Sequence, residues 1–281
     1  MINYILASLA GLCATSQSTL TKLAPTDKGK GYIMSFNTVK VGSAFILFLL
    51  VSLHNLSFHF ETFLFSSLYG FALFFSTLFG YLALASGSLA LTSSIVSYSV
   101  LIPSVFGIIF LEESVNAVKL CGFAILLVSL TMLKKPTKGT IGDGKWLLYT
   151  AITFLCNGLM SIIQKLHQTA FPMQHRNEFT IYSMFVCLLL FVLSAFLHRN
   201  DGNFKTENIK FAAPAGALLG LNNYLTLSLS SALDASVLFP TVSVFQVIFN
   251  LTFSKFIFKE KLSKLQLCGV ALGVISVLLI K

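Results

Sequence analysis

Residues 258–269 read FKEKLSKLQLCG, and residues 111–122 read LEESVNAVKLCG. Each stretch has a glutamate at its third position and ends in Leu-Cys-Gly at the same spacing. An apolar segment precedes each stretch and a second apolar segment that ends in lysine follows it, so residues 93–134 and 237–281 share one plan. Because a duplicated unit dictates how a fold is assembled, this repeat divides the chain into two halves.

The duplication extends beyond these two stretches. A polar linker at 134–145, which carries one proline and three glycines, separates the halves, so we expect two domains, residues 1–138 and residues 139–281. Short motifs of the first half recur in the second at a nearly constant offset: Leu12-Cys13 with Leu155-Cys156, Lys22-Leu23 with Lys165-Leu166, and Tyr81-Leu82 with Tyr224-Leu225.

The composition is that of an integral membrane protein. Of the 281 residues, 56% are hydrophobic and only 10% are charged, and the mean hydropathy is +0.84, which is more apolar than a soluble core requires. In hydrocarbon every backbone polar group must be satisfied internally, so apolar runs of about twenty residues form helices. The sequence predicts an all-α fold of ten transmembrane helices, roughly at 2–22, 32–53, 63–86, 89–111, 116–133, 146–166, 178–197, 209–231, 235–257 and 263–280.

The formal net charge of +9 does not indicate nucleic-acid binding. Most lysines and arginines flank the predicted helix ends, where positive charge meets lipid headgroups and sets orientation. The expected partners are therefore the lipid bilayer and a small-molecule substrate, with no nucleic acid.

Each half contains five predicted spans. Because five is an odd number, the second half must cross the membrane in the opposite direction, which makes the halves inverted-topology repeats. Transporters use such repeats to place a shared site near the membrane midplane, around which the halves rock.

Ten spans in two five-helix halves, each closing with a glutamate turn and a glycine-bearing helix, resemble the EamA-type permeases of the drug/metabolite transporter superfamily. The residues that carry the resemblance are Glu113 with Gly122 and Glu260 with Gly269. The resemblance implies a multi-pass transporter of the cell membrane, with its fifth and tenth helices at the periphery rather than around the pore.

Polar residues inside the spans are the candidate substrate-binding residues, because they are costly in a membrane and face a cavity or another helix. For any one of them, packing with a satisfied polar tip is the competing interpretation. The set as a whole favours a polar-lined cavity for an amphipathic metabolite. The candidates are Gln17, Asn37, Lys40, Tyr81, Tyr98, Asn157, Gln164, Asn223, Tyr224, Gln246 and Asn250.

Lys40 has two interpretations. It lies about 12 Å inside the start of the second span, and a lysine near the bilayer centre costs roughly 3 kcal/mol. The side chain either extends to the membrane interface or faces the central cavity and attracts a carboxylate or phosphate. Its repeat-equivalent is close to Ser183, so such a charge would be asymmetric.

The repeated glutamates and glycines are expected to be structural. Glu113 and Glu260 are placed to cap the helices that follow them, near the positive end of the helix dipole. Small residues let helix backbones approach closely, and we expect Gly122, Gly269 and Gly273 to do so. Two packings are open for the last span: within the monomer, or against a second copy in a homodimer.

Several chemistries lack the residues they need. All ten acidic residues lie in loops or at helix ends, which disfavours proton-coupled export of lipophilic cations through a buried carboxylate. Residues 139–145 have the spacing of a phosphate-binding loop, but Trp146 replaces its Ser/Thr. The five cysteines fall inside apolar runs and offer no metal-ligand pair. We expect no enzyme activity, no metal and no cofactor.

Two sequence features predict opposite orientations of the chain in the membrane. Loops that follow odd-numbered spans hold most of the lysines and arginines, and the positive-inside rule would then put both termini outside. The family resemblance puts both termini in the cytoplasm, and we prefer that placement.

The sequence thus predicts a permease that moves a small amphipathic metabolite, such as an amino acid or a related compound, by alternating access. A multidrug efflux transporter is the alternative within the same class. A non-transporting membrane scaffold or receptor is a more distant one.

Overall fold

The computed structural model describes residues 2–24, 30–52, 56–86, 95–96, 98–132, 144–198, 209–257 and 264–280. Within these ranges the chain forms helices joined by turns, and no strand occurs. The α-helices are α1 (Ile2–Leu23), α2 (Lys30–Ser52), α3 (Phe60–Ser86), α5 (Leu101–Phe110), α6 (Ala117–Met132), α7 (Gly144–Ala170), α8 (Arg176–Leu197), α9 (Ile209–Ser230), α10 (Ala235–Phe256) and α11 (Lys264–Ile280), and the 3-10 turn η1 (Tyr98–Val100) leads into α5.

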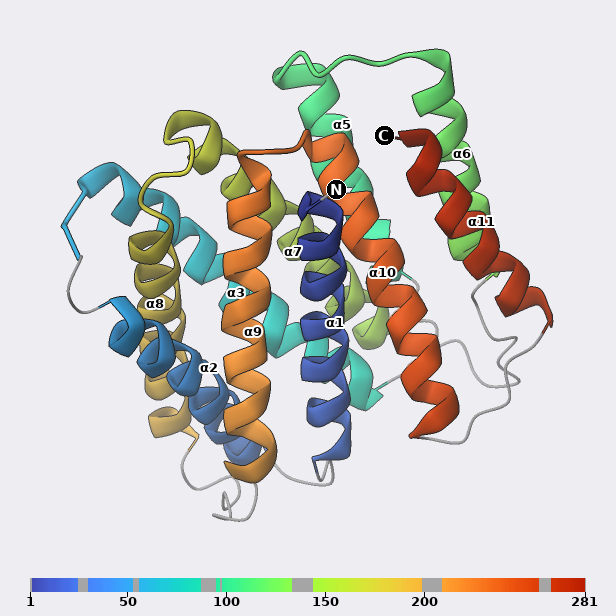
Figure 1. The fold of residues 1–281 in the computed structure, drawn as a ribbon. Coiled ribbons are helices and arrows are strands. Elements are labelled where there is room, and N and C mark those ends of the chain that lie inside the picture. The colour runs from blue at the N-terminus through green and yellow to red at the C-terminus, as the bar shows by residue number, and fades with distance from the viewer. Residues whose placement is uncertain are drawn as a thin grey trace.

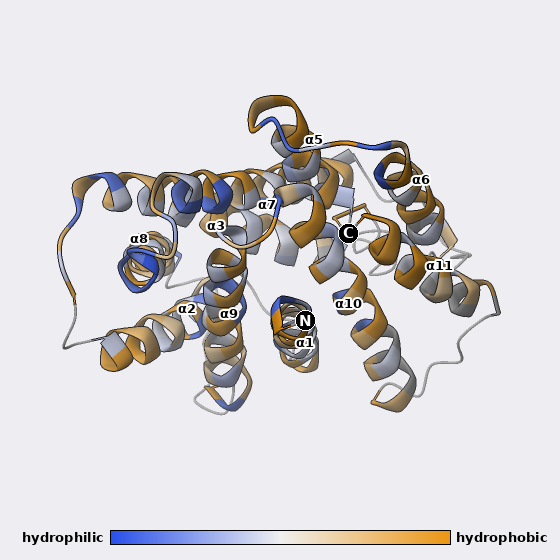
Figure 2. Ribbon diagram, turned by 45° about the horizontal axis from the view of Figure 1, so that its top comes forward, coloured by the Kyte–Doolittle hydropathy of each residue, from blue (hydrophilic) through white to orange (hydrophobic). Residues whose placement is uncertain are grey.

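The helices are those of a multi-pass membrane protein. Within the described ranges, four segments are long and apolar enough to cross a membrane: Gly31–Ser52, Phe60–Ala83, Gly144–Ala170 and Arg176–Leu197. Shorter apolar segments lie in η1 with α5, and in α6, α10 and α11. Figure 2 shows hydrophobic residues along most of each helix and hydrophilic residues gathered in turns at helix ends. Many large apolar side chains are exposed on the outer faces, as a lipid-facing surface requires.

The most extensive helix contacts join the two halves of the chain. Helix α3 packs on α7, and α1 packs on α9. Helix α2 packs on α9, and α8 packs on α3. Helices α2 and α8 also contact each other. Each of these contacts has its counterpart when the halves are exchanged. Helix α1 begins and α11 ends at the same end of the bundle (Figure 1).

Glycines allow two of these contacts to be close. A methyl group at Gly216 on α9 would overlap the carbonyl oxygen of Lys40 on α2. A methyl group at Gly70 on α3 would lie 2.7 Å from the carbonyl oxygen of Ser183 on α8. Because Lys40 and Ser183 are equivalent in the sequence repeat, the same backbone position of each half meets a glycine of the other.

Helices α6 and α11 form a pair at one edge of the bundle, as Figure 1 shows. A methyl group at Gly122 would lie 2.7 Å from Cγ1 of Ile280, and Ser129 Oγ donates a hydrogen bond of 2.7 Å to the carbonyl oxygen of Gly269. A methyl group at Gly273 would lie 3.0 Å from Ser129 Oγ. Helix α11 therefore packs on α6 within the chain.

Candidate functional site

A buried amide links both halves in the interior. Gln164 on α7 is 4% exposed, and its Nε2 donates to the hydroxyl of Tyr69 on α3 and to the carbonyl oxygen of Asn223 on α9, each at 3.3 Å. Ser230 Oγ donates to the carbonyl oxygen of Gln164 at 3.3 Å. We call Gln164, Tyr69 and Asn223 the central amide cluster.

Lys40 lies in the middle of α2 and is only 4% exposed. The side chains of Lys40 and Tyr69 both lie near Cys187 on α8, which places Lys40 in the same region as the central amide cluster. Among the described residues the Lys40 ammonium has no counter-ion. A buried cation without a charged partner is costly. Because Lys40 is only 4% exposed, its side chain does not lie on the outer surface of the bundle.

Further polar groups line the region. Asn223 is 7% exposed, and its Nδ2 has no hydrogen-bond partner among the described residues. Asn157 Oδ1 accepts a hydrogen bond of 2.5 Å from Ser76 Oγ across the contact of α7 with α3. Asn37 donates to the carbonyl oxygen of Ile33 on its own helix at 3.0 Å. The Asn223 amide nitrogen is enclosed by protein atoms, and a buried donor without a partner costs free energy.

Glu113 holds the first turn of α10. Its Oε1 accepts from the N–H of Ala235 at 2.6 Å, and its Oε2 accepts from the N–H and the hydroxyl of Ser236 at 3.0 and 2.6 Å. The prediction that Glu113 caps the helix that follows it is therefore wrong, because Glu113 caps a helix of the other half. Asn116 Oδ1 takes that place for α6 by accepting from the N–H of Lys119 at 2.7 Å.

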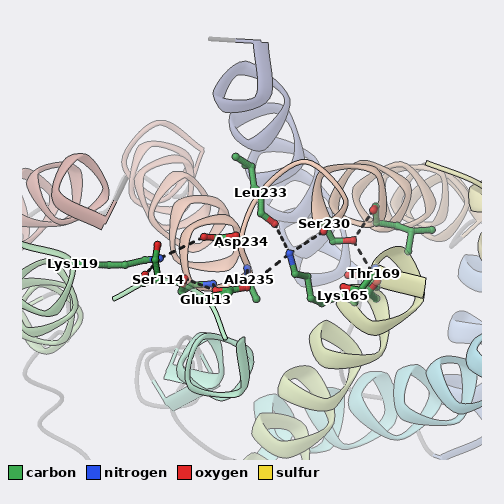
Figure 3. Close-up of polar contacts among 12 residues, drawn as sticks. Glu113, Ser114, Lys119, Lys165, Thr169, Ser230, Leu233, Asp234 and Ala235 are labelled. Carbon is green, nitrogen blue, oxygen red and sulfur yellow. Dashed lines mark hydrogen bonds and ion pairs between the residues drawn. The ribbon is translucent and has the colours of Figure 1, made fainter. Parts of the chain in front are cut away.

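Lys165 holds the neighbouring helix end. Its ammonium donates to the carbonyl oxygens of Ser230 and Leu233 at 3.2 and 2.7 Å, where α9 ends, and lies 3.8 Å from Glu113 Oε1. Lys119 forms a second pair with Asp234 at 3.7 Å. Figure 3 shows these charges around the α9–α10 turn. The anion faces the N-terminus of α10 and the cation faces the C-terminus of α9, as the helix dipoles favour. We call Glu113 and Lys165 the turn clamp.

Tyr224 follows Asn223 in α9, but its ring makes contacts outside the central amide cluster. Its ring packs on Phe48 at 5.5 Å between centroids, and the Arg176 guanidinium lies 5.8 Å from the ring centroid. A polar pocket of about 130 Å³ opens here, lined by Met173, His175, Arg176, Asn177, Glu178 and Tyr224.

The other candidate residues are dispersed. Gln17 and Tyr81 are partly buried on α1 and α3, whereas Tyr98 packs against an apolar core that includes Leu238. Gln246 contributes its backbone, since its carbonyl oxygen accepts from Thr15 Oγ1 at 3.0 Å. Asn250 is on the exposed surface of α10. Glu260 lies outside the described residues.

Sequence reasoning did not select Tyr69, Lys165, Cys187 or Arg176. Lys165 could have been selected from the sequence, because it is the repeat-equivalent of Lys22. Tyr69 and Cys187 could not, since a tyrosine and a cysteine inside apolar spans are indistinguishable from packing residues before their neighbours are known.

Comparisons with known proteins agree with this fold. The model of the EamA-like transporter family matches residues 144–281. A solved structure, described as a crystal structure of a protein, superposes with a TM-score of 0.72 at 15% identity, covering 97% of this chain and 97% of that chain. At this identity the likeness shows the fold alone. A comparison with curated proteins found no match.

The matched residues contain α7 to α11, which supply Gln164, Asn223 and the α9–α10 turn. Residues 144–281 thus match the EamA-like transporter family, which is part of the drug/metabolite transporter superfamily.

Proposed function

We propose that this membrane transporter moves a small amphipathic metabolite that carries a negative charge, such as an amino acid or a related carboxylate. The observation that carries the proposal is Lys40, a lysine in the middle of α2 that is 4% exposed and has no counter-ion within the part of the chain that the structure describes. Lysines inside membrane spans face cavities or partners rather than lipid. An anionic group on a substrate would supply the counter-charge for the Lys40 ammonium.

The amide groups near Lys40 support an amphipathic rather than a purely ionic substrate. The Asn223 Nδ2 donor is unpaired, and the phenol of Tyr69 lies one hydrogen bond from Gln164. Aromatic rings with polar tips bind molecules that have an apolar body and a polar end.

We further propose that residues 1–138 and 139–281 are inverted repeats that rock against each other in alternating access. The exchange symmetry of the helix contacts supports this, as does the paired placement of Lys40 and Ser183 against glycines of the opposite half. A site at the junction of two such halves is reachable from each side in turn.

Uptake into proteoliposomes tests the function. The purified protein is reconstituted and offered a panel of radiolabelled amino acids and related carboxylates, and binding is ranked by ligand-induced thermal stabilisation. Lys40→Gln is expected to lower uptake at least tenfold, because it removes the charge from a dry site. Lys210→Gln is the matched control, since Lys210 is exposed at the start of α9. No flux across the panel, or equal flux in both variants, would reject the proposal.

We propose the cell membrane as the location, with both termini on the cytoplasmic side. The common end of the bundle at which α1 begins and α11 ends supports a shared side for the termini. Reporter fusions at Lys281 and within the linker at 134–145 test the orientation. A cytoplasmic linker would overturn it.

A further inference from the structure

The neighbour Gln168 defines the tautomer of the buried histidine His167, which means the ring nitrogen that carries the proton. His167 is fully buried on α7, and Gln168 Nε2 lies 3.1 Å from His167 Nδ1 while Thr62 Oγ1 lies 3.2 Å from His167 Nε2. Which ring nitrogen carries the proton depends on the group opposite each of them.

The orientation of the Gln168 amide is fixed by two backbone groups. Its Oε1 accepts from the N–H of Met173 at 3.1 Å, and its Nε2 donates to the carbonyl oxygen of Gln174 at 3.2 Å. Exchanging the amide oxygen and nitrogen would break both bonds. The amide nitrogen therefore faces the ring, so His167 Nδ1 must accept and His167 Nε2 must hold the single proton, donated to Thr62.

Gln168 also holds the turn between α7 and α8. Met173 and His175 have positive φ angles of 61° and 50°, which only a minority of non-glycine residues adopt. Such a backbone persists where surrounding contacts over-determine it, and the two Gln168 bonds are contacts of this kind. The turn also supplies Met173 and His175 to the pocket beside Arg176.

A proton on His167 Nδ1 would make that nitrogen a donor that faces another donor, Nε2 of Gln168. The amide of Gln168 could then accept from the ring only by turning over, which would release Met173 and Gln174. We propose that His167 is a proton-binding site whose occupancy sets the conformation of the turn at 171–175. The proton comes from water, and no other group is consumed.

Two further histidines lie at the same end of the molecule, and the Phe171 ring, which cannot carry a proton, contacts both His175 and His167. The rings of His59 and His175 lie 3.7 Å apart and are partly exposed, and the Phe171 ring lies between His175 and His167, at 5.7 and 5.4 Å from them. Other charged or titratable groups on the elements packed around His167 include Glu61 and Tyr69 on α3 and Arg176, Glu178 and Tyr182 on α8. Glu178 Oε1 accepts from Ser57 Oγ at 3.2 Å.

The turn is joined to the rest of the molecule through Met173. Its sulfur accepts a hydrogen bond of 2.9 Å from Ser231 Oγ, in the α9–α10 turn that the turn clamp holds. A change at 171–175 is thereby passed to the end of α9.

Nuclear magnetic resonance tests this without any transport measurement, so a failure of the proposed substrate leaves the test intact. The protein is labelled with ¹⁵N-histidine and ¹³C-methyl methionine in lipid nanodiscs and titrated from roughly pH 8 to 4. At neutral pH the His167 ring is expected in the Nε2–H form. On acidification the Met173 methyl signal, assigned with Met173→Leu, is expected to shift with the same midpoint as His167.

Three variants separate the site from a general effect of acid. His167→Asn keeps an acceptor for Gln168 but cannot take up a proton, so the Met173 signal should stay at its neutral-pH position. Gln168→Glu offers a carboxylate to Nδ1 and should move the midpoint of His167 up by about one pH unit or more. His198→Asn is the control, since His198 contacts only the Ser194 carbonyl oxygen at the far end of α8, and it should leave the Met173 titration unchanged. A neutral Nδ1–H ring, or a Met173 signal that ignores the His167 titration, would overturn the proposal.

Discussion

Removing the charge of Glu113 is expected to destabilise the protein by about 3 kcal/mol. The carboxylate is buried, with 4% of its side chain exposed, and accepts three hydrogen bonds from the first turn of α10. Hydrogen bonds to a charged group contribute about 1.5–3 kcal/mol each, and their losses do not add fully. Glu113→Gln retains one acceptor and turns an amide donor toward a second donor.

Two smaller effects have the same sign. Neutralisation removes an anion from the positive end of α10, which is worth about 0.3–2 kcal/mol depending on burial. It also leaves the Lys165 ammonium, 12% exposed and 3.8 Å away, without its counter-charge. Part of that loss is offset because Lys165 keeps its bonds to the Ser230 and Leu233 carbonyl oxygens.

The assay is reversible unfolding in mixed detergent micelles, which gives the free energy of unfolding for each variant. Glu112→Gln is the matched control, because Glu112 is the adjacent residue, is exposed, and makes none of these bonds; its effect should stay within about 0.5 kcal/mol. Adding Lys165→Met to Glu113→Gln should show a coupling of about 1 kcal/mol in a double-mutant cycle. Equal stability of Glu113→Gln and Glu112→Gln would refute the cap.

Two further substitutions probe the helix contacts. Gly216→Ala should lower the yield of folded protein severely, since its methyl group would overlap the Lys40 carbonyl oxygen. Gly144→Ala should have no effect, because no atom lies within 4 Å of the added carbon. Size-exclusion profiles of the two variants in detergent would show the difference. Tyr69→Phe should cost about 1 kcal/mol by the same unfolding assay, because it removes one of the two acceptors of the buried Gln164 amide.

The helix positions could be predicted from hydropathy because a membrane imposes the length of each apolar run. The predicted span at 32–53 became α2, Lys30–Ser52, and the span at 178–197 became α8, Arg176–Leu197, both apolar enough over their length to cross a membrane. The predicted span at 89–111 is described only from Tyr98 onward, as η1 and α5, apart from two helical residues at 95–96.

Contacts between distant helices could not be predicted in the same way. The sequence repeat identified Glu113 but did not identify its partners, which are backbone N–H groups more than a hundred residues away on α10. Likewise, Gln164 stood out as a large amide in an apolar span, whereas its acceptor Tyr69 resembled any packed aromatic residue. Hydropathy and spacing report on one helix at a time, and these bonds depend on how two helices meet.

The same bonds affect how stable either half is on its own. Gln164 finds its acceptor Tyr69 in the first half, Ser43 Oγ donates to the carbonyl oxygen of Ala213 at 2.8 Å, and Glu113 satisfies the N-terminus of α10. An isolated half would lose these bonds, although Gln164 Nε2 would keep the Asn223 carbonyl oxygen and Ser43 Oγ would keep the Lys40 carbonyl oxygen. We therefore expect the two halves to be more stable together than apart. The central amide cluster draws on α3 from one half and on α7 and α9 from the other.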